Sequence, residues 1–255
     1  MLNVKYEASN PAGSPTVILA ASLGTDRTMW QEQVELLPRS WNVVTFDLRG
    51  HGASPLSPTT PSIEDFADDV IAIADDIGVQ RFAFCGLSIG GAIGQSLAAR
   101  YPERLGSLVL ASTGLTILTP EGLLERSERV LREGTEWVAD ASAPRWFTAR
   151  FRAEHPEVVS AKMDHLRNMP ARAYADACLA LAGFDGHDAA GAISAPTLVL
   201  VGSDDVATPP SGGAELAAAI HGAEVRNLPD ASHLCSVEQP ALFTELLQRH
   251  VEAHG

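Results

Sequence analysis

The sequence predicts an α/β fold in which helices cover both faces of a mostly parallel sheet. Short apolar runs recur along the chain without alternating with polar residues, which is typical of strands buried on both faces. Segments with helical periodicity separate these runs, as expected for parallel strands joined by crossover helices. The chain has 255 residues, 45% of them hydrophobic, and this is enough for one large domain of this class.

Predicted strands and helices alternate along most of the chain. The segment 63–77 repeats apolar residues every three or four positions, and Gly78 follows it as a helix C-cap would. Small residues in 90–100 and 213–220 favour closely packed helices. The predicted strands are residues 17–19, 43–46, 81–85, 108–110, 197–201 and 224–228.

The alternation stops between residues 110 and 197, where no strand is predicted. An unstructured segment of this length is uncommon in a compact domain. We therefore interpret it as a helical cap over the C-terminal ends of the strands, where α/β proteins bind ligands. Two ordinary crossover helices with long connections are the alternative. The predicted domains are a core of 1–113 and 193–255 and a cap of 114–192, with helical pieces at 121–139, 143–153, 157–168 and 171–182.

The charge balance argues against several classes of partner. Eighteen Lys and Arg residues against 32 Asp and Glu give a formal net charge of −14, and the basic residues do not cluster. Such a chain is poorly suited to bind nucleic acid or an anionic membrane surface. The longest apolar runs, 16–21 and 107–111, are far shorter than the ~18–20 residues of a membrane span. We expect no nucleic-acid or membrane partner, while the oligomeric state stays unknown.

The cysteines and the N-terminal residues favour a cytoplasmic protein. Three cysteines are an odd number and form no CxxC pair, so a reduced compartment fits better than a disulfide framework. Residues 1–5 lead into a polar stretch with no hydrophobic signal segment. No HxxEH or paired CxxC motif for zinc and no GxxxxGKS/T loop for phosphates is present. We therefore expect no metal and no cofactor.

The segment Gly86-Leu87-Ser88-Ile89-Gly90 follows a predicted buried strand and precedes a small-residue helix. This is the pattern of a nucleophile elbow, in which a serine occupies a strained strand-to-helix turn and glycines keep clear of neighbouring backbone. The turn would expose the Ser88 hydroxyl and aim the N–H of Ile89 at an oxyanion. The pattern therefore predicts Ser88 as a nucleophile.

A serine nucleophile requires a base, and the chain order expected for this elbow is serine, acid, histidine. Of the eight histidines, only His233 lies downstream in a loop after a predicted strand. His51 precedes the serine and is interpreted as bracing a turn, while His250 and His254 lie on the C-terminal tail. We therefore predict His233 as the base, against the alternative of a structural loop histidine.

We expect the acid that orients the histidine to follow one of two predicted strands, at 108–110 or at 197–201. The strand at 108–110 is followed by Ala-Ser-Thr-Gly, which offers no carboxylate. The strand at 197–201 is followed by Asp204 and Asp205. Because neighbouring side chains in an extended loop point apart, at most one of them can face the imidazole. We predict Asp205, with Asp204 as the alternative.

Together these segments resemble the α/β-hydrolase fold family, in family order over essentially the whole chain. Within that family the sequence is most similar to the 3-oxoadipate enol-lactonases of bacterial aromatic catabolism. Arg-Gly-His-Gly-Ala-Ser at 49–54, the elbow and Ala-Ser-His-Leu at 231–234 carry the resemblance to the wider family. The narrower motifs are Ser-Leu-Gly-Thr-Asp at 22–26 and Pro-Arg-Trp-Phe at 144–147. The resemblance implies the α/β-hydrolase fold with a cap inserted before the acid-bearing strand.

The resemblance also implies an oxyanion hole and a substrate pocket. Many relatives have His-Gly before the residue that gives the second oxyanion N–H, whereas this chain has Ala21-Ser22 followed by Leu23. The donor is a backbone group, so we assign the oxyanion hole to the N–H groups of Leu23 and Ile89. Arg145 and Trp146 are candidates for binding the substrate carboxylate. The alternatives are a surface arginine and a tryptophan in the core of the cap.

The reaction that the resemblance implies is hydrolysis of a carboxylate-bearing enol-lactone through an acyl-enzyme, with a small-molecule substrate and no cofactor. The nearest rival is a general carboxylesterase with the same machinery, and a C–C bond hydrolase is a further one. A haloalkane dehalogenase would carry Asp in place of Ser88. From another class, a catalytically weak ligand receptor can share this fold.

Overall fold

The computed structural model describes residues 2–7 and 14–254. Its centre is a seven-stranded sheet in the order β1-β3-β2-β4-β5-β6-β7, in which β1 is antiparallel to β3 and all other neighbours are parallel. The predicted mostly parallel α/β fold is therefore confirmed. The strands are β1 (Val4–Glu7), β2 (Thr16–Ala20), β3 (Asn42–Phe46), β4 (Phe82–Leu87), β5 (Leu105–Ala111), β6 (Thr197–Gly202) and β7 (Glu224–Leu228).

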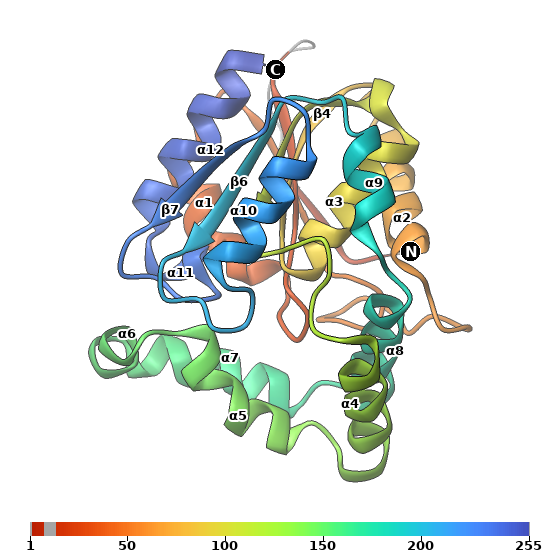
Figure 1. The fold of residues 1–255 in the computed structure, drawn as a ribbon, viewed down its shortest axis with the longest axis vertical. Helices are drawn as coiled ribbons and strands as arrows, with labels where there is room; N and C mark the ends of the chain where they lie inside the picture. The colour runs from red at the N-terminus through yellow and green to blue at the C-terminus, as the bar shows by residue number, and fades with distance from the viewer. Residues whose placement is uncertain (1, 8–13, 255) are drawn as a thin grey trace.

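Helices cover both faces of the sheet (Figure 1). One face carries α2 (Ile63–Asp76), α3 (Ile89–Arg100), α9 (Gly186–Ala192) and α10 (Pro210–Ala219). The other carries α1 (Gln31–Leu36) and α12 (Pro240–His254), with the short α11 (Cys235–Glu238) beside them. Because both faces are covered, every residue of strands β2 to β6 is buried.

Two parts of the core differ from the sequence expectation. The edge strand β1 was not predicted because it is short and half apolar, and its Val4 and Lys5 are exposed. The C-terminal tail that carries His250 and His254, for which the sequence analysis predicted no element, is the long helix α12. Its buried Phe243, Leu247 and Val251 recur every four residues, which is the helical period.

Five helices form a layer across the C-terminal ends of the strands, at the bottom of Figure 1. They are α4 (Pro120–Glu133), α5 (Glu136–Trp146), α6 (Ala149–Glu154), α7 (Pro156–Arg167) and α8 (Ala171–Ala182). We call this layer the cap. The remaining helix of the insertion, α9, packs against α3 and α10 of the core. The division into residues 114–192 and the rest stays a prediction.

The expectation of one helix over 121–139 is wrong. The chain leaves α4 at Gly134, whose φ of +79° is a conformation that glycine adopts without strain, and α5 begins two residues later. The expected helix 143–153 is also divided, because Phe147 is extended and Thr148 caps a new helix by accepting from the Phe151 N–H. Over the described residues, no helix has both the length and the apolar character to cross a bilayer.

Candidate active site

Ser88 occupies the sharp turn between β4 and α3. Its backbone has φ 60° and ψ −115°, a strained conformation for a residue with a side chain. A Cβ atom at Gly86 would overlap the carbonyl of Gly90, and one at Gly90 would overlap the carbonyl of Ala20. The Ser88 N–H donates to the Ala111 carbonyl at 2.9 Å, which ties the turn to β5. The two glycines are therefore required by close backbone approach, as the elbow pattern predicts.

The loops after β6 and β7 are joined by backbone contacts. The N–H of Ser203 donates to the Leu228 carbonyl and the N–H of Asp204 to the Ala231 carbonyl, both at 2.9 Å. A side chain at Gly202 would overlap the Ser232 carbonyl. These contacts bring the acidic loop against the loop that carries the candidate base.

Asp205 and His233 form a buried hydrogen-bonded pair. The Nδ1–H of His233 donates to Oδ2 of Asp205 at 2.9 Å, and the Thr208 hydroxyl donates to the same oxygen at 2.7 Å. The other carboxylate oxygen accepts the N–H groups of Ala207 and Thr208 at 2.8 and 2.9 Å. Burial alone would raise the pKa of Asp205, but the positive charge of His233 and these hydrogen bonds outweigh burial and lower it.

Asp204, the alternative acid, points elsewhere. Its side chain is exposed and, among the described residues, accepts only from the Ser203 hydroxyl, at 3.4 Å. Its backbone instead holds the two loops together. The structure thus brings Asp205, and not Asp204, to His233.

Ser88 and His233 line one half-buried cavity of about 50 Å³. Ser88 is 5% exposed and His233 4%, so both are largely shielded from water. Within the described residues no hydrogen bond joins the Ser88 hydroxyl to the imidazole. With Nδ1 bound to Asp205, the Nε2 atom is the one left to take a proton from the serine.

The predicted oxyanion donors lie on two different elements. Ile89 is the first residue of α3, so its N–H has no acceptor within the helix. Leu23 lies in a turn closed by the Thr25 N–H and hydroxyl, which donate to the Ser22 carbonyl at 3.1 and 2.8 Å. Leu23 also lines the cavity. Gly24 has φ +81°, as the third residue of a type II turn requires.

Arg145 and Trp146, at the end of α5, both line the cavity. Their carbonyl groups, which have no partner inside the helix, accept from the Ser232 hydroxyl at 2.9 Å and from the Leu234 N–H at 3.0 Å. These bonds attach the cap to the residues on both sides of His233. The Trp146 ring lies against Gly24, where a side chain would meet it at 3.4 Å.

Among the cavity-lining residues that the sequence analysis missed are Arg126, Tyr174 and Thr208. Arg126 follows Leu123 by three residues and precedes Val130 by four, and both of these are buried. The helical period therefore places Arg126 on the inward side of α4, a signal that was present in the sequence. Tyr174 and Thr208 carry no comparable motif.

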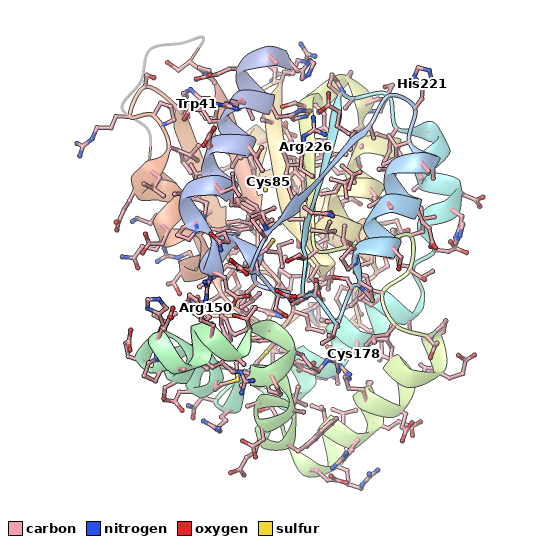
Figure 2. The ribbon with its side chains drawn as sticks, turned by 60° about the vertical axis from the view of Figure 1, so that its left-hand side comes forward. Trp41, Cys85, Arg150, Cys178, His221 and Arg226 are labelled. Atoms are coloured by element: carbon pink, nitrogen blue, oxygen red, sulfur yellow. The ribbon has the colours of Figure 1, made fainter. Side chains whose placement is uncertain are left out.

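The three cysteines are buried, and burial raises the pKa of Cys85 well above its ordinary value and that of Cys178 and Cys235 to about 12. They are therefore unreactive thiols. Figure 2 shows Cys85 inside the sheet and Arg150 where the cap meets the core, 3.7 Å from Asp230. Among the described residues, no group of three or more His, Cys, Asp and Glu side chains is arranged to hold a metal ion.

Comparison with known proteins agrees with this geometry. Residues 15–240 match the model of the alpha/beta hydrolase fold family. A 3-oxoadipate enol-lactonase of Acinetobacter baylyi is 34% identical over 96% of this chain and 91% of its own length. RutD of Variovorax paradoxus, named as a carbamate hydrolase, is 32% identical over 95% of this chain and 93% of its own.

A solved structure extends the likeness to the fold of the whole chain. The crystal structure of the enol-lactonase from Burkholderia xenovorans has a TM-score of 0.95 and 35% sequence identity, with 98% of this chain and 96% of that chain covered. The resemblance found in the sequence is therefore confirmed. This chain belongs to the α/β-hydrolase fold family.

Proposed function

We propose that this hydrolase opens a small enol-lactone that carries a carboxylate, giving an open-chain 3-oxo dicarboxylate such as 3-oxoadipate. The observation that carries the proposal is the His233–Asp205 hydrogen bond of 2.9 Å beside the cavity that holds the Ser88 hydroxyl. The enol-lactonase relatives and the uncompensated Arg145 in the same cavity support the choice of substrate.

In the proposed reaction, Ser88 Oγ attacks the lactone carbonyl carbon while His233 Nε2 takes the serine proton. The N–H groups of Leu23 and Ile89 bind the oxyanion, each contributing on the order of 2–4 kcal/mol to transition-state stabilisation. The ring C–O bond breaks, and the leaving enolate takes the proton from His233 and ketonises. His233 then deprotonates a water that attacks the acyl carbon. The bond from that carbon to Ser88 Oγ breaks, Oγ takes the proton back from His233, and the second carboxylate is released. Asp205 keeps the imidazole in the required tautomer.

The size of the cavity adds a requirement for movement. A volume of about 50 Å³ is much smaller than the ~300–1,000 Å³ of typical ligand pockets. The cap helices or the side chains that line the cavity must therefore shift when a lactone enters. When these groups close again over the bound substrate, they shield the acyl-enzyme from bulk water.

A carbamate or a simple ester is the second candidate substrate, because the RutD relative is almost as similar to this chain as the enol-lactonase. The same triad can attack either carbonyl group. The two candidates differ in the charge of the substrate, since a simple ester brings no carboxylate of its own into a cavity that is lined by arginine.

The test supplies freshly generated 3-oxoadipate enol-lactone and follows its disappearance spectrophotometrically, beside a panel of p-nitrophenyl esters and a carbamate. We expect kcat/KM for the lactone to exceed that for the others by at least ~100-fold. Ser88→Ala and His233→Ala should each lower kcat by roughly 10⁴-fold or more. Rapid ester or carbamate hydrolysis with an inert lactone would reject the proposal, and tight binding without turnover would indicate a receptor.

A further inference from the structure

The cavity beside Ser88 has a charge composition that the proposed reaction does not by itself explain. Among the described residues that line it, Arg126 and Arg145 are the permanently charged ones, and none is an aspartate or glutamate. They come from two different cap helices, α4 and α5. This local positive charge is opposite in sign to the chain as a whole, whose formal net charge is −14.

Neither guanidinium has a carboxylate partner within residues 2–7 and 14–254. The carboxylate whose charge acts on Arg145 is Asp205, which His233 and Thr208 already bind. The other two arginines of α4 are different, because Arg129 and Arg132 each pair with Glu133 at 2.8 Å.

The two arginines also act on each other. Burial lowers the pKa of Arg145, and the positive charge of Arg126 lowers it further. Two like charges in a half-buried cavity repel, and a bound anion relieves that repulsion. Because a guanidinium binds a carboxylate through two parallel N–H groups, two guanidinium groups offer room for two carboxylates.

Tyr174 of α8 lies beside Arg126 in the lining of the cavity. The tyrosine is 3% exposed, and burial raises its pKa to about 12, so that it stays neutral. The charge of Arg126 and a hydrogen bond with it act in the opposite direction on this pKa. Both arginines therefore lie near Tyr174, and Arg145 also senses the charge of Asp205 in the triad.

We propose that Arg126 and Arg145 form a two-arginine clamp that makes the site specific for ligands with two carboxylates. Arg126, placed by Tyr174, binds the remote carboxylate of the substrate, and Arg145 binds the carboxylate that water creates at the acyl carbon of Ser88. This inference rests on the proposed function and deepens it, because it names Arg126 as the residue that determines substrate class.

The clamp is tested by ligand binding, without turnover. Isothermal titration calorimetry on the Ser88→Ala protein compares adipate with hexanoate, which has the same chain length and one carboxylate. We expect adipate to bind at least ~10-fold more tightly. Adding Arg126→Ala should reduce this preference to about 2-fold or less, and Arg126→Gln should do the same if the alanine variant fails to fold. Adding Arg132→Ala, an exposed arginine on the same helix, should preserve it.

Tyr174→Phe gives a second readout, because it removes the hydroxyl and keeps the buried ring. We expect the adipate preference to fall about 3- to 5-fold while hexanoate binding changes less, which a general loss of structure would not produce. Equal binding of adipate and hexanoate to the Ser88→Ala protein would overturn the clamp. So would equal effects of the Arg126 and Arg132 variants.

The kinetic assay separates the clamp from the proposed reaction. If wild-type protein prefers adipate through Arg126 but leaves the enol-lactone intact, the clamp stands and the proposed substrate is wrong. If the lactone is hydrolysed but Arg126→Ala leaves the ratio of kcat/KM for the lactone to that for p-nitrophenyl acetate unchanged, the clamp is wrong. We expect this ratio to fall at least ~10-fold.

Discussion

At Ser88 the backbone adopts a strained turn so that the side chain can leave the sheet. Its φ of 60° persists because β4, α3 and β5 determine the turn from three sides, through the glycine contacts and the N–H bond to Ala111. The same turn begins α3 at Ile89, so the nucleophile and a candidate oxyanion donor are fixed by one backbone feature.

Asp205 and Asp204 provide a direct test of the triad at this scale. Asp205→Asn removes the carboxylate that orients His233, and we expect kcat to fall about 10⁴-fold, by analogy with the same change in a serine protease. Asp204→Asn alters an exposed side chain and should change kcat less than about 3-fold. Steady-state kinetics on the best substrate measures both. The reverse order of effects would show that the acid is Asp204.

Some of these residues were easier to predict from the sequence than others. Ser88 was predictable because the elbow needs glycines at fixed positions, and His233 because a parallel sheet brings the ends of β6 and β7 together. The sequence analysis predicted Asp205 but kept Asp204 as the alternative, since two adjacent carboxylates carry the same local signal, and the structure brings Asp205 to His233. Arg126 was overlooked among the many charged residues of α4, although its spacing from Leu123 places it inward.

At the scale of elements, the cap and the histidine loop position each other. The carbonyl groups of Arg145 and Trp146, which end α5, accept from the Ser232 hydroxyl and the Leu234 N–H. Glu238 of α11 adds a third connection. Its carboxylate accepts from the Ser232 N–H at 2.5 Å and from the Thr148 N–H and hydroxyl at 2.9 and 2.8 Å.

Glu238→Ala should loosen this connection. Leaving the donors of Ser232 and Thr148 unsatisfied costs about 1–3 kcal/mol, and we expect kcat/KM to fall roughly 10-fold as His233 becomes less well positioned. Hydrogen exchange at the amides of Ser232 and Thr148 should accelerate. Glu245→Ala, on an exposed Glu–Arg pair of α12, is the matched control. Unchanged exchange at both amides in Glu238→Ala would refute the coupling.

The elements themselves were predictable where burial on both faces produces unbroken apolar runs, as in β2 to β6. They were less predictable in the cap, where the helix breaks depend on single residues. Gly134 separates α4 from α5, while Pro144 stands within the last turn of α5.

At the scale of the whole molecule, stability depends on a buried group outside the active site. His51 lies in the loop after β3, with Nδ1 3.1 Å from the Arg49 carbonyl and Nε2 buried without a partner among the described residues. Burial lowers the pKa of His51 to about 4. The hydrogen bond with the Arg49 carbonyl and the charges of Asp47 and Asp26 oppose this shift, whereas the charge of His165 adds to it.

Because the folded state favours neutral His51, its contribution to stability is complete above the unfolded-state pKa of ~6.5 and is lost as pH falls through about 4. A shift of this size corresponds to about 3 kcal/mol.

Urea unfolding of wild type and His51→Gln between pH 7 and 4 measures this contribution to the free energy of unfolding. The carboxylates that titrate in this range are common to both proteins, so their effect cancels in the comparison. We expect the free energy of unfolding of wild type to fall about 3 kcal/mol more than that of the variant. His221→Gln, at an exposed position, should follow the wild type. Parallel curves for wild type and His51→Gln would show that the buried imidazole does not control acid unfolding.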